Sequence, residues 1–454
     1  MKFINIPQTE KKQFKKKTKN KSLIIIIGLF IALIIIISTY LIFFSKKKSK
    51  IYLKTKKNTD LNILPAHNYT TIKKVQNFDS NNITDKVSYI DGKLFWNNEK
   101  TLDQLRIRNE IREYNNIQLS FENKEDFIKR ENPLITIVIT IYNQENKIKS
   151  IYASIQKQEL KDIEIIFVDD ASTDESAKVI KLLMEKDKRI VYLKNDVNKR
   201  AFYSRYKGVL NSKGNYVLVI DPDDLLINNI LIKAYGTAIK YDLDIVQFYM
   251  MIGYYNSPHL WSDLKYSSGI LKGNSEIRKI FYYGISRNLP DKLIRRETFI
   301  KSIKFMKPEY YELDYHINDD DTAFFGLIHV AQSYGFLEQI GYFYILKYPT
   351  PENHKKFLDG LNSGFESMAN IFRYFYYQSD NNTLEKSNIC YKYFEKNNNN
   401  LAKHIKDLTG GFDPIIDALN LYSNSTYFND IQKIQINSFK NKIIARKKEV
   451  QEHK

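Results

Sequence analysis

The sequence has few cysteines, few tryptophans and, near its N-terminal end, almost no acidic side chains. The single cysteine among 454 residues, Cys390, excludes an internal disulfide framework and a cysteine-rich metal site. Residues 1–57 contain 15 lysines, no arginine and one acidic residue, Glu10, and they carry +14 of the formal net charge of +18. Because the rest of the chain carries only +4, we expect no basic groove for nucleic acid in the folded part and no nucleic-acid partner.

An uncharged hydrophobic run of 23 residues, 22–44, separates two lysine-rich blocks. As a helix it would span roughly 34 Å, enough to cross a hydrocarbon core of about 30 Å. A buried core helix and a cleaved signal peptide are the alternatives. The run is longer than the about 7 to 15 residues of a signal peptide's apolar region, however, and no small-residue cleavage site follows it. It therefore predicts one transmembrane helix, with the lipid bilayer as a partner.

From Pro133 onward, short apolar runs alternate with segments of helical periodicity. The apolar runs cover residues 134–141, 163–169, 189–194, 216–221 and 244–251. Their β-branched composition is typical of strands that are covered on both faces. After the first run, Ile148, Ile151, Tyr152 and Ile155 follow the spacing of an amphipathic helix. The alternation predicts an α/β domain with a mostly parallel sheet.

Polar side chains follow three of the expected strands. Tyr142 comes after the first strand, Asp169 and Asp170 end the second, and Asp221 ends the fourth. Ligands of open α/β sheets bind outside the carboxyl ends of the strands. We therefore expect these side chains to converge on one crevice.

The acidic segment Asp-Pro-Asp-Asp, residues 221–224, has two interpretations. Asp221 and Asp223 supply hard oxygen ligands at a spacing that suits Mg²⁺ or Mn²⁺ held by carboxylates and substrate phosphates. Alternatively, Asp223 or Asp224 is the N-cap of a helix beginning near Leu225. The segment alone does not decide between them.

Five motifs occur in an order that resembles glycosyltransferase family 2. They are LITIVITIYN, IEIIFVDDASTDES, NKRAFYSRYKGVLNSKGNYVLVIDPDD, DKLIRRETFIKSIKF and DDDTAFF. The resemblance covers about residues 133–346. It implies a GT-A type nucleotide-sugar domain that inverts the anomeric centre. The donor would be a nucleoside-diphosphate sugar, expected to be a UDP-sugar, and the acceptor a hydroxyl of a glycan, glycoprotein or glycolipid.

The resemblance also implies roles for individual residues. Tyr142, Asp169 and Asp170 would contact the donor base, Arg205 would contact the donor or be a structural helix arginine, Asp221 would approach the ribose or the metal, and Asp223 would bind the Mn²⁺ or Mg²⁺ ion. Asp321, or Asp320 one residue earlier, would be the general base that accepts the proton of the acceptor hydroxyl.

Several positions depart from the family pattern. Arg200 stands where the family commonly has glycine, Tyr206 where it has asparagine, and Asp320 where it has glutamate. These departures keep a second hypothesis open, a catalytically inactive, membrane-tethered relative that binds a glycan or a partner. Both tryptophans, Trp96 and Trp261, precede the acidic run, so the Gln-x-x-Arg-Trp element of processive synthases is missing. We therefore expect transfer of one or a few sugars and no polymer export.

The membrane orientation is left open by the charges, because residues 1–21 contain eight lysines and residues 45–57 contain seven. Four glycosylation sequons, at Asn68, Asn82, Asn381 and Asn424, are compatible with a type II protein of the Golgi or endoplasmic reticulum. The alternative is a plasma-membrane protein with a cytosolic catalytic domain. The predicted organisation is a basic tail (1–21), a transmembrane helix (22–44), a stem with a hairpin around Asp91 and Gly92 (45–132), a catalytic domain (133–350) and a helical C-terminal region (351–454).

Overall fold

The computed structural model describes the greater part of the chain beyond residue 82. The described residues are 83–97, 104–114, 119–261, 269–283, 287–305, 319–347, 391, 394–395, 402–403, 405–408, 412–424 and 428–452. All of them lie in one compact unit, Val75–Lys454. The predicted transmembrane helix, residues 22–44, lies outside them. None of the helices in the described ranges is long and apolar enough to span a bilayer.

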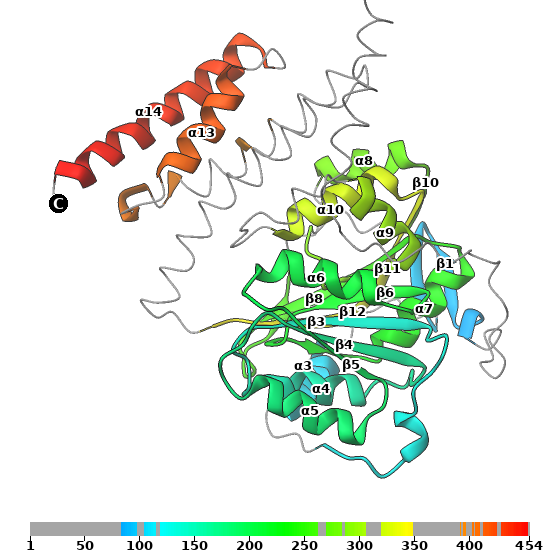
Figure 1. Ribbon diagram of the computed structural model, residues 1–454. Helices are drawn as coiled ribbons and strands as arrows, with labels where there is room; N and C mark the ends of the chain where they lie inside the picture. Colours follow the sequence, from blue (N-terminus) through cyan, green and yellow to red (C-terminus); the bar gives the residue numbers. More distant parts are fainter. Residues whose placement is uncertain are drawn as a thin grey trace, which may run out of the picture. The chain divides into compact units, whose positions relative to one another are not determined.

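A twelve-stranded mixed sheet forms the centre of the protein (Figure 1). Its strands are β1 (Val87–Ile90), β2 (Lys93–Trp96), β3 (Ile135–Ile141), β4 (Ile163–Asp169), β5 (Ile190–Lys194), β6 (Tyr216–Ile220), β7 (Leu225–Leu226), β8 (Ile245–Gly253), β9 (His259–Leu260), β10 (Ile270–Lys272), β11 (Lys292–Arg295) and β12 (Ser333–Ile345). The main path runs β1-β2-β12-β8-β11-β6-β3-β4-β5, while β7 and β10 pair with β12 and β9 pairs with β8.

The helices cover both faces of this sheet. They are α3 (Gln104–Glu113), α4 (Ile148–Gln156), α5 (Ser176–Lys186), α6 (Arg200–Asn211), α7 (Ile230–Lys240), α8 (Asn274–Tyr283), α9 (Arg296–Phe305) and α10 (Asp319–Val330). Side chains alternate along a strand. Thus Val138 of β3 packs in one core with α6, α9 and α10, whereas Ile137 and Ile139 pack in the other core with α4 and α7 (Figure 1).

The strands expected at the start of the domain are confirmed. β3 pairs in parallel with β4 and β6, and β4 pairs in parallel with β5. Every residue of β3, β4 and β6 is buried, as their β-branched runs predict. Close packing of α6 on β3 needs a glycine, because a Cβ atom at Gly208 would lie 2.3 Å from Val138 Cγ1.

The expectation of a mostly parallel sheet is wrong for the other half. The four-residue strand β11 lies between β6 and β8 and is antiparallel to both. β8 and β12 are parallel to each other, but β7 and β10 pair antiparallel with β12. Strands of two to four residues are too short to show a periodic pattern, so the sequence did not indicate the direction of these additions.

The hairpin expected in the stem is present as β1 and β2. Asp91 and Gly92 have φ angles of 50° and 79°, as a type I′ turn requires. The hairpin is not a separate structure, however, because β2 pairs with β12 through Leu94 and Leu337. The central sheet therefore includes residues upstream of the boundary expected at Pro133.

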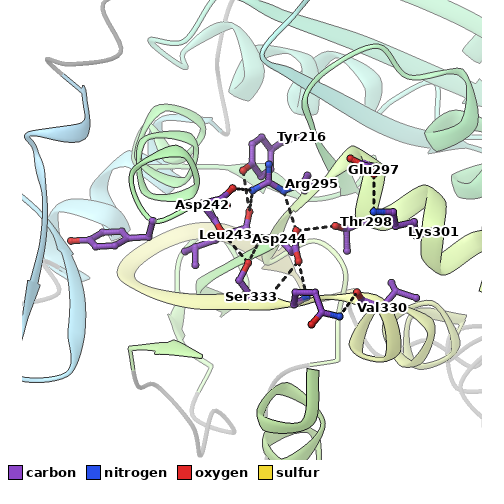
Figure 2. Close-up of polar contacts among 12 residues, drawn as sticks. Tyr216, Asp242, Leu243, Asp244, Arg295, Glu297, Thr298, Lys301, Val330 and Ser333 are labelled. Carbon is purple, nitrogen blue, oxygen red and sulfur yellow. Dashed lines mark hydrogen bonds and ion pairs between the residues drawn. The ribbon is translucent and has the colours of Figure 1, made fainter. Parts of the chain in front are cut away.

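A polar cluster around Arg295 connects the first residues of β8 and β12 (Figure 2). Arg295 Nε lies 3.0 Å from Asp244 Oδ1, and its Nη2 lies 2.5 Å from Asp242 Oδ1. Thr298 Oγ1 donates to the same Asp244 oxygen at 3.0 Å, and Asp244 N donates to Ser333 Oγ at 2.8 Å. Because β6 starts here as well, the cluster lies at the opposite end of that strand from Asp221.

Two helices described near the C-terminus, α13 (Phe412–Ser423) and α14 (Asp430–Glu452), form a helical hairpin. Tyr422 stacks on Phe428 at their connection, with ring centroids 5.3 Å apart. Lys447 Nζ of α14 pairs with Asp413 Oδ1 of α13 at 2.5 Å. The described part of this region is helical, as the sequence predicts.

Candidate active site

Polar residues from three neighbouring strands meet at one edge of the sheet. The strands β6, β3 and β4 lie side by side and run parallel, so their carboxyl ends share this edge. Asp221 follows β6, Tyr142 follows β3, and Asp169 is the last residue of β4. The convergence predicted from the sequence is confirmed.

The turn after β3 is fixed to the turn after β4. Asn143 has a φ of 52°, and its backbone N donates to Ser172 Oγ at 3.1 Å. Its side-chain oxygen accepts from Thr173 N at 2.9 Å. Beside this junction the ring of Tyr142 is 46% exposed. Tyr142 is thus an accessible aromatic surface on a rigid turn, which suits stacking on a base.

The carboxylates of Asp169 and Asp170 are buried and hydrogen-bonded within the domain. Asp169 Oδ2 accepts from Tyr192 OH at 2.5 Å and its Oδ1 accepts from Ser172 N at 2.8 Å. Asp170 Oδ1 accepts from Asn195 Nδ2 and from Lys199 N, at 2.8 and 2.7 Å. Burial and the bond to Asp169 raise the pKa of Tyr192 well above its ordinary value. The two aspartates order the loops around the expected base site, and direct base contacts by them remain a prediction.

Arg205 connects the end of β6 to the first turn of α10. It projects from α6 and is buried, with Nη2 2.7 Å from Asp221 Oδ1 and Nη1 in contact with Asp320 Oδ1. Asp320 Oδ2 also accepts from Leu289 N at 3.3 Å. Asp321 lies in the same turn, but its side chain is outside the description. Arg205 therefore brings the end of β6 next to the first turn of α10, where the general base is expected. The sequence predicted a role for Arg205 but not these two partners.

Asp223 is paired with a lysine that the sequence reading missed. Lys347 Nζ lies 2.7 Å from Asp223 Oδ2, and the lysine side chain is 63% exposed. Partial burial lowers the pKa of Lys347, but Asp223 outweighs this effect and raises the pKa above its ordinary value. Lys347 stands two residues beyond the end of β12, outside any motif, so only the fold could bring it to this carboxylate.

Asp224 is not a helix cap, which corrects one interpretation of the acidic segment. The next helix, α7, begins at Ile230 with Asn229 as its N-cap. Asp224 is buried instead, and its carboxylate accepts from Tyr342 OH at 2.6 Å and from Ile345 N at 2.9 Å. Burial and the neighbouring Asp223 and Asp221 raise the pKa of Asp224 well above its ordinary value. Asp224 thereby fastens the acidic segment to β12.

Asp221 and Asp223 have donor atoms that fit a divalent cation completed by phosphate oxygens. Each ion pair uses one carboxylate oxygen, Asp221 Oδ1 or Asp223 Oδ2. Mg²⁺ typically uses one or two carboxylates plus substrate phosphates. Within the residues that the structure describes, no three His, Cys, Asp or Glu side chains are grouped to hold a metal. A metal here would depend on the substrate for part of its coordination.

The two departures on α6 have structural consequences. Arg200, where the family commonly has glycine, has a φ of 70°, in the region that favours glycine. Tyr206 lines a cavity of about 20 Å³ between α6 and α9. The other lining residues are Phe202, Arg205, Leu289, Phe299, Ser302, Ile303 and Ala323. Tyr206 is thus a packing residue in this fold.

A buried ion pair between Asp291 and Lys292 lies at the start of β11 and supports the site. The sequence did not predict it. Lys292 Nζ lies 2.5 Å from Asp291 Oδ1, and both side chains are fully buried. Asp291 Oδ2 accepts from Gln247 Nε2 at 2.9 Å, and Lys292 Nζ lies 4.7 Å from the centre of the Phe324 ring in α10. The segment that contains Leu289 is therefore held against the first turns of α10.

Comparison with known proteins shows which protein family the sheet domain resembles. Residues 136–306 match the model of glycosyl transferase family 2, so the chain carries a domain of that family and the resemblance is confirmed. Glycosyltransferase GlyA of Streptococcus pneumoniae serotype 4 is 36% identical over 111 residues, which are 24% of this chain and 16% of that protein. Glycosyltransferase GlyG of the same organism is 34% identical over 113 residues, which are 25% and 38% of the two chains.

Another relative has a named reaction, and one solved structure shares the fold. An Escherichia coli protein, UDP-Glc:alpha-D-GlcNAc-diphosphoundecaprenol beta-1,3-glucosyltransferase WfaP, is 37% identical over 91 residues, or 20% of this chain and 36% of that protein. The chain thus spans well under half the length of these curated relatives. S. aureus TarS 1-349 in complex with UDP-GlcNAc aligns with a TM-score of 0.51 at 16% identity, covering 70% of this chain and 90% of that one. The fold is GT-A-like.

Proposed function

We propose that this protein transfers a sugar from a nucleoside-diphosphate sugar to an acceptor hydroxyl with inversion, without processive polymerisation. The observation that carries the proposal is the Arg205 bridge between Asp221 and Asp320. It holds a donor-binding strand end beside the acidic turn of α10, as single displacement requires. The names of the relatives, which include a UDP-glucose-dependent enzyme, support a UDP-sugar donor.

The residues would divide the work between donor and acceptor. Tyr142 would stack on the donor base, and Asp221 would face the ribose or the metal. A carboxylate at the start of α10, Asp321 or Asp320, would accept the proton of the acceptor hydroxyl as its oxygen attacks the anomeric carbon. Attack from the side opposite the departing diphosphate inverts that carbon. Arg205 already engages Asp320, which favours Asp321 as the base.

A divalent ion, Mn²⁺ or Mg²⁺, is part of the proposal because of the charge balance. The carboxylates of Asp221, Asp223 and Asp320 gather at this site, where Arg205 and Lys347 pair with them. A site with this excess of negative charge repels a diphosphate. Asp223 and Asp221 would hold the ion, and when bound it would supply positive charge to the departing diphosphate.

Membrane anchoring by residues 22–44 and a glycan, glycoprotein or glycolipid acceptor complete the proposal. The relatives named above are bacterial and give no support to the Golgi location expected from the sequons. A plasma-membrane protein with a cytosolic catalytic domain is therefore the orientation that we propose. Protease accessibility of the C-terminal body in sealed vesicles and in opened cells distinguishes the two orientations.

Conservative substitutions test the chemistry. Asp321→Asn should lower turnover of a UDP-sugar by about 10²- to 10⁴-fold, the usual range for a lost catalytic acid or base. Asp223→Asn should also lower turnover, because it removes a carboxylate from the proposed metal site. Asp320→Asn should lower it less if Asp321 is the base. Glu185→Gln, at an exposed position of α5, is the matched control. Full activity of Asp223→Asn and Asp321→Asn would refute the mechanism.

The second candidate function is an inactive relative that binds a glycan or a partner. Protein cations already engage both carboxylates expected at the metal, Asp221 and Asp223, and this observation favours it. Calorimetry with UDP, with and without Mn²⁺, separates the candidates. Metal-dependent UDP binding supports the enzyme, and absence of UDP binding under both conditions supports the inactive relative.

A further inference from the structure

Two aromatic side chains stand together beside the acidic segment. Trp261, directly after β9, and Tyr344, near the end of β12, meet edge to face, with ring centroids 6.3 Å apart and planes at 85°. The backbone of Trp261 is fixed by a bond from its N to Met250 O at 3.0 Å. Tyr344 is 41% exposed although it is a large aromatic residue. We call these two side chains the aromatic pair.

The strand geometry directs Tyr344 toward the site. Tyr342 and Tyr344 are two residues apart on β12, so their side chains lie on the same face of the strand. The Tyr342 hydroxyl accepts from Asp221 N at 3.2 Å and donates to Asp224. Tyr344 therefore lies one step further along the same face of β12 than Tyr342, which contacts the acidic segment. Burial and the neighbouring Asp224, Asp221 and Asp223 raise its pKa, as this position requires.

The polar tips of the pair are available to a ligand. Within the part of the chain that the structure describes, neither the Tyr344 hydroxyl nor the Trp261 indole N–H forms a hydrogen bond. A ring face with a hydrogen-bonding tip matches a pyranose, which offers C–H groups on one face and hydroxyls around its rim. The neighbouring carboxylates add acceptors for sugar hydroxyls.

We propose that the aromatic pair is a binding platform for a pyranose ring, in which Tyr344 contacts the sugar and Trp261 supports Tyr344 and borders the site. This inference rests on the proposed function, because the sugar would be that of the donor or of the acceptor. Both sources share the same ring chemistry, and they are separated by the ligands used in the test.

Tryptophan fluorescence gives a test that is independent of turnover. The chain has two tryptophans, so Trp96→Phe leaves Trp261 as the only indole reporter. Because Trp96 is buried in the core, Trp96→Phe is itself a change in the core. The same titrations are therefore also run on the wild-type chain and on Trp261→Phe, and the difference between these two chains gives the emission of Trp261 with Trp96 in place. The probes, all with Mn²⁺, are UDP, UDP-glucose, UDP-N-acetylglucosamine, and methyl glucoside in the presence of UDP.

We expect a saturable change of Trp261 emission with a sugar-containing probe that exceeds the change with UDP alone. A response to UDP-sugars assigns the platform to the donor, and a response to methyl glucoside assigns it to the acceptor. Tyr344→Ala should weaken that sugar's binding by about tenfold and leave UDP affinity unchanged, whereas Tyr344→Phe should keep most of the affinity.

The result that overturns the platform is UDP binding in calorimetry with no Trp261 response to any sugar and no effect of Tyr344→Ala. Failure of the proposed function looks different. In that case UDP itself does not bind in the presence of Mn²⁺, either to the wild-type chain or to the Tyr344→Ala and Tyr344→Phe variants.

Discussion

Lys347 and Asp223 are 124 positions apart in the chain, yet Lys347 Nζ lies 2.7 Å from Asp223 Oδ2. If Asp223 binds a divalent ion, the lysine competes with that ion for the same carboxylate. Lys347→Met should therefore increase the affinity for Mn²⁺ in the absence of nucleotide. Because the lysine is 63% exposed, we expect an increase of only about two- to fivefold, the range of solvent-screened ion pairs.

Electron paramagnetic resonance of free Mn²⁺ measures this affinity directly. Lys347→Arg keeps the positive charge and is the matched control, with an affinity close to that of the wild-type chain. Equal or weaker Mn²⁺ binding by Lys347→Met would show that Asp223 and the ion do not meet.

Arg200 adopts a backbone conformation that favours glycine, with a φ of 70°. A residue with a Cβ atom in this region costs about 1–2 kcal/mol. Glycine relieves this strain, but it also has more conformational freedom in the unfolded chain, which offsets part of the gain. Arg200→Gly should therefore increase the free energy of unfolding by about 1 kcal/mol. Arg200→Ala keeps the Cβ atom and controls for loss of the side chain. Urea unfolding measures both, and equal stability of the two variants would contradict the explanation by strain.

The buried pair of Asp291 and Lys292 should be far more sensitive to substitution than an exposed pair. Lys292→Met removes the cation that pairs with the buried carboxylate of Asp291, and breaking a buried ion pair costs about 3–5 kcal/mol. Figure 2 shows the comparison pair, Glu297 and Lys301, which are 2.7 Å apart and largely exposed. Lys301→Met should change the free energy of unfolding by less than about 0.5 kcal/mol. Similar losses in both variants would mean that burial does not control the effect.

The parts of the site that the sequence predicted are those fixed by local patterns. β-branched runs predicted β3, β4 and β6, and parallel strands bring their carboxyl ends together, so Asp221 and Tyr142 were expected at one edge. Contacts between distant segments could not be predicted. Asp224 was interpreted as a possible cap because its partner, Tyr342, is 118 residues away. Lys347 and Tyr344 carry no motif, and only the pairing of β12 brings them to the acidic segment.

The same limit explains helix α3, which the sequence assigned to a stem. Ile107 and Ile111 of α3 pack in one buried cluster with Leu225 and Ile227, directly after the acidic segment. Glu110 fastens the helix there, because its Oε1 accepts from Asn228 N at 2.9 Å. The helix therefore supports the strand that follows the acidic segment, and it packs with the central sheet and not as part of a separate stem.

Glu110 gives this contact a defined pH dependence. Burial raises its pKa above the ordinary value of 4.5, although Asn228 and nearby lysines act in the opposite direction. A carboxyl whose pKa is raised by folding contributes most to stability below its unfolded pKa, and this contribution is lost as the pH rises through the folded value. Glu110→Gln keeps the acceptor oxygen and removes the titration. From about pH 4.5 upward, the wild-type chain should therefore lose stability relative to Glu110→Gln.

Urea unfolding at intervals from pH 4 to pH 8 measures this difference, since the other titrating groups are common to both chains. Ile111→Ala, at a fully buried position of α3, tests the packing of the helix separately and should cost about 2–4 kcal/mol. Ile434→Ala, at a position of α14 that is 67% exposed, is its matched control and should have little effect. If the wild-type and Glu110→Gln curves run parallel while Ile111→Ala is strongly destabilising, the helix packs as described but folding does not raise the pKa of Glu110.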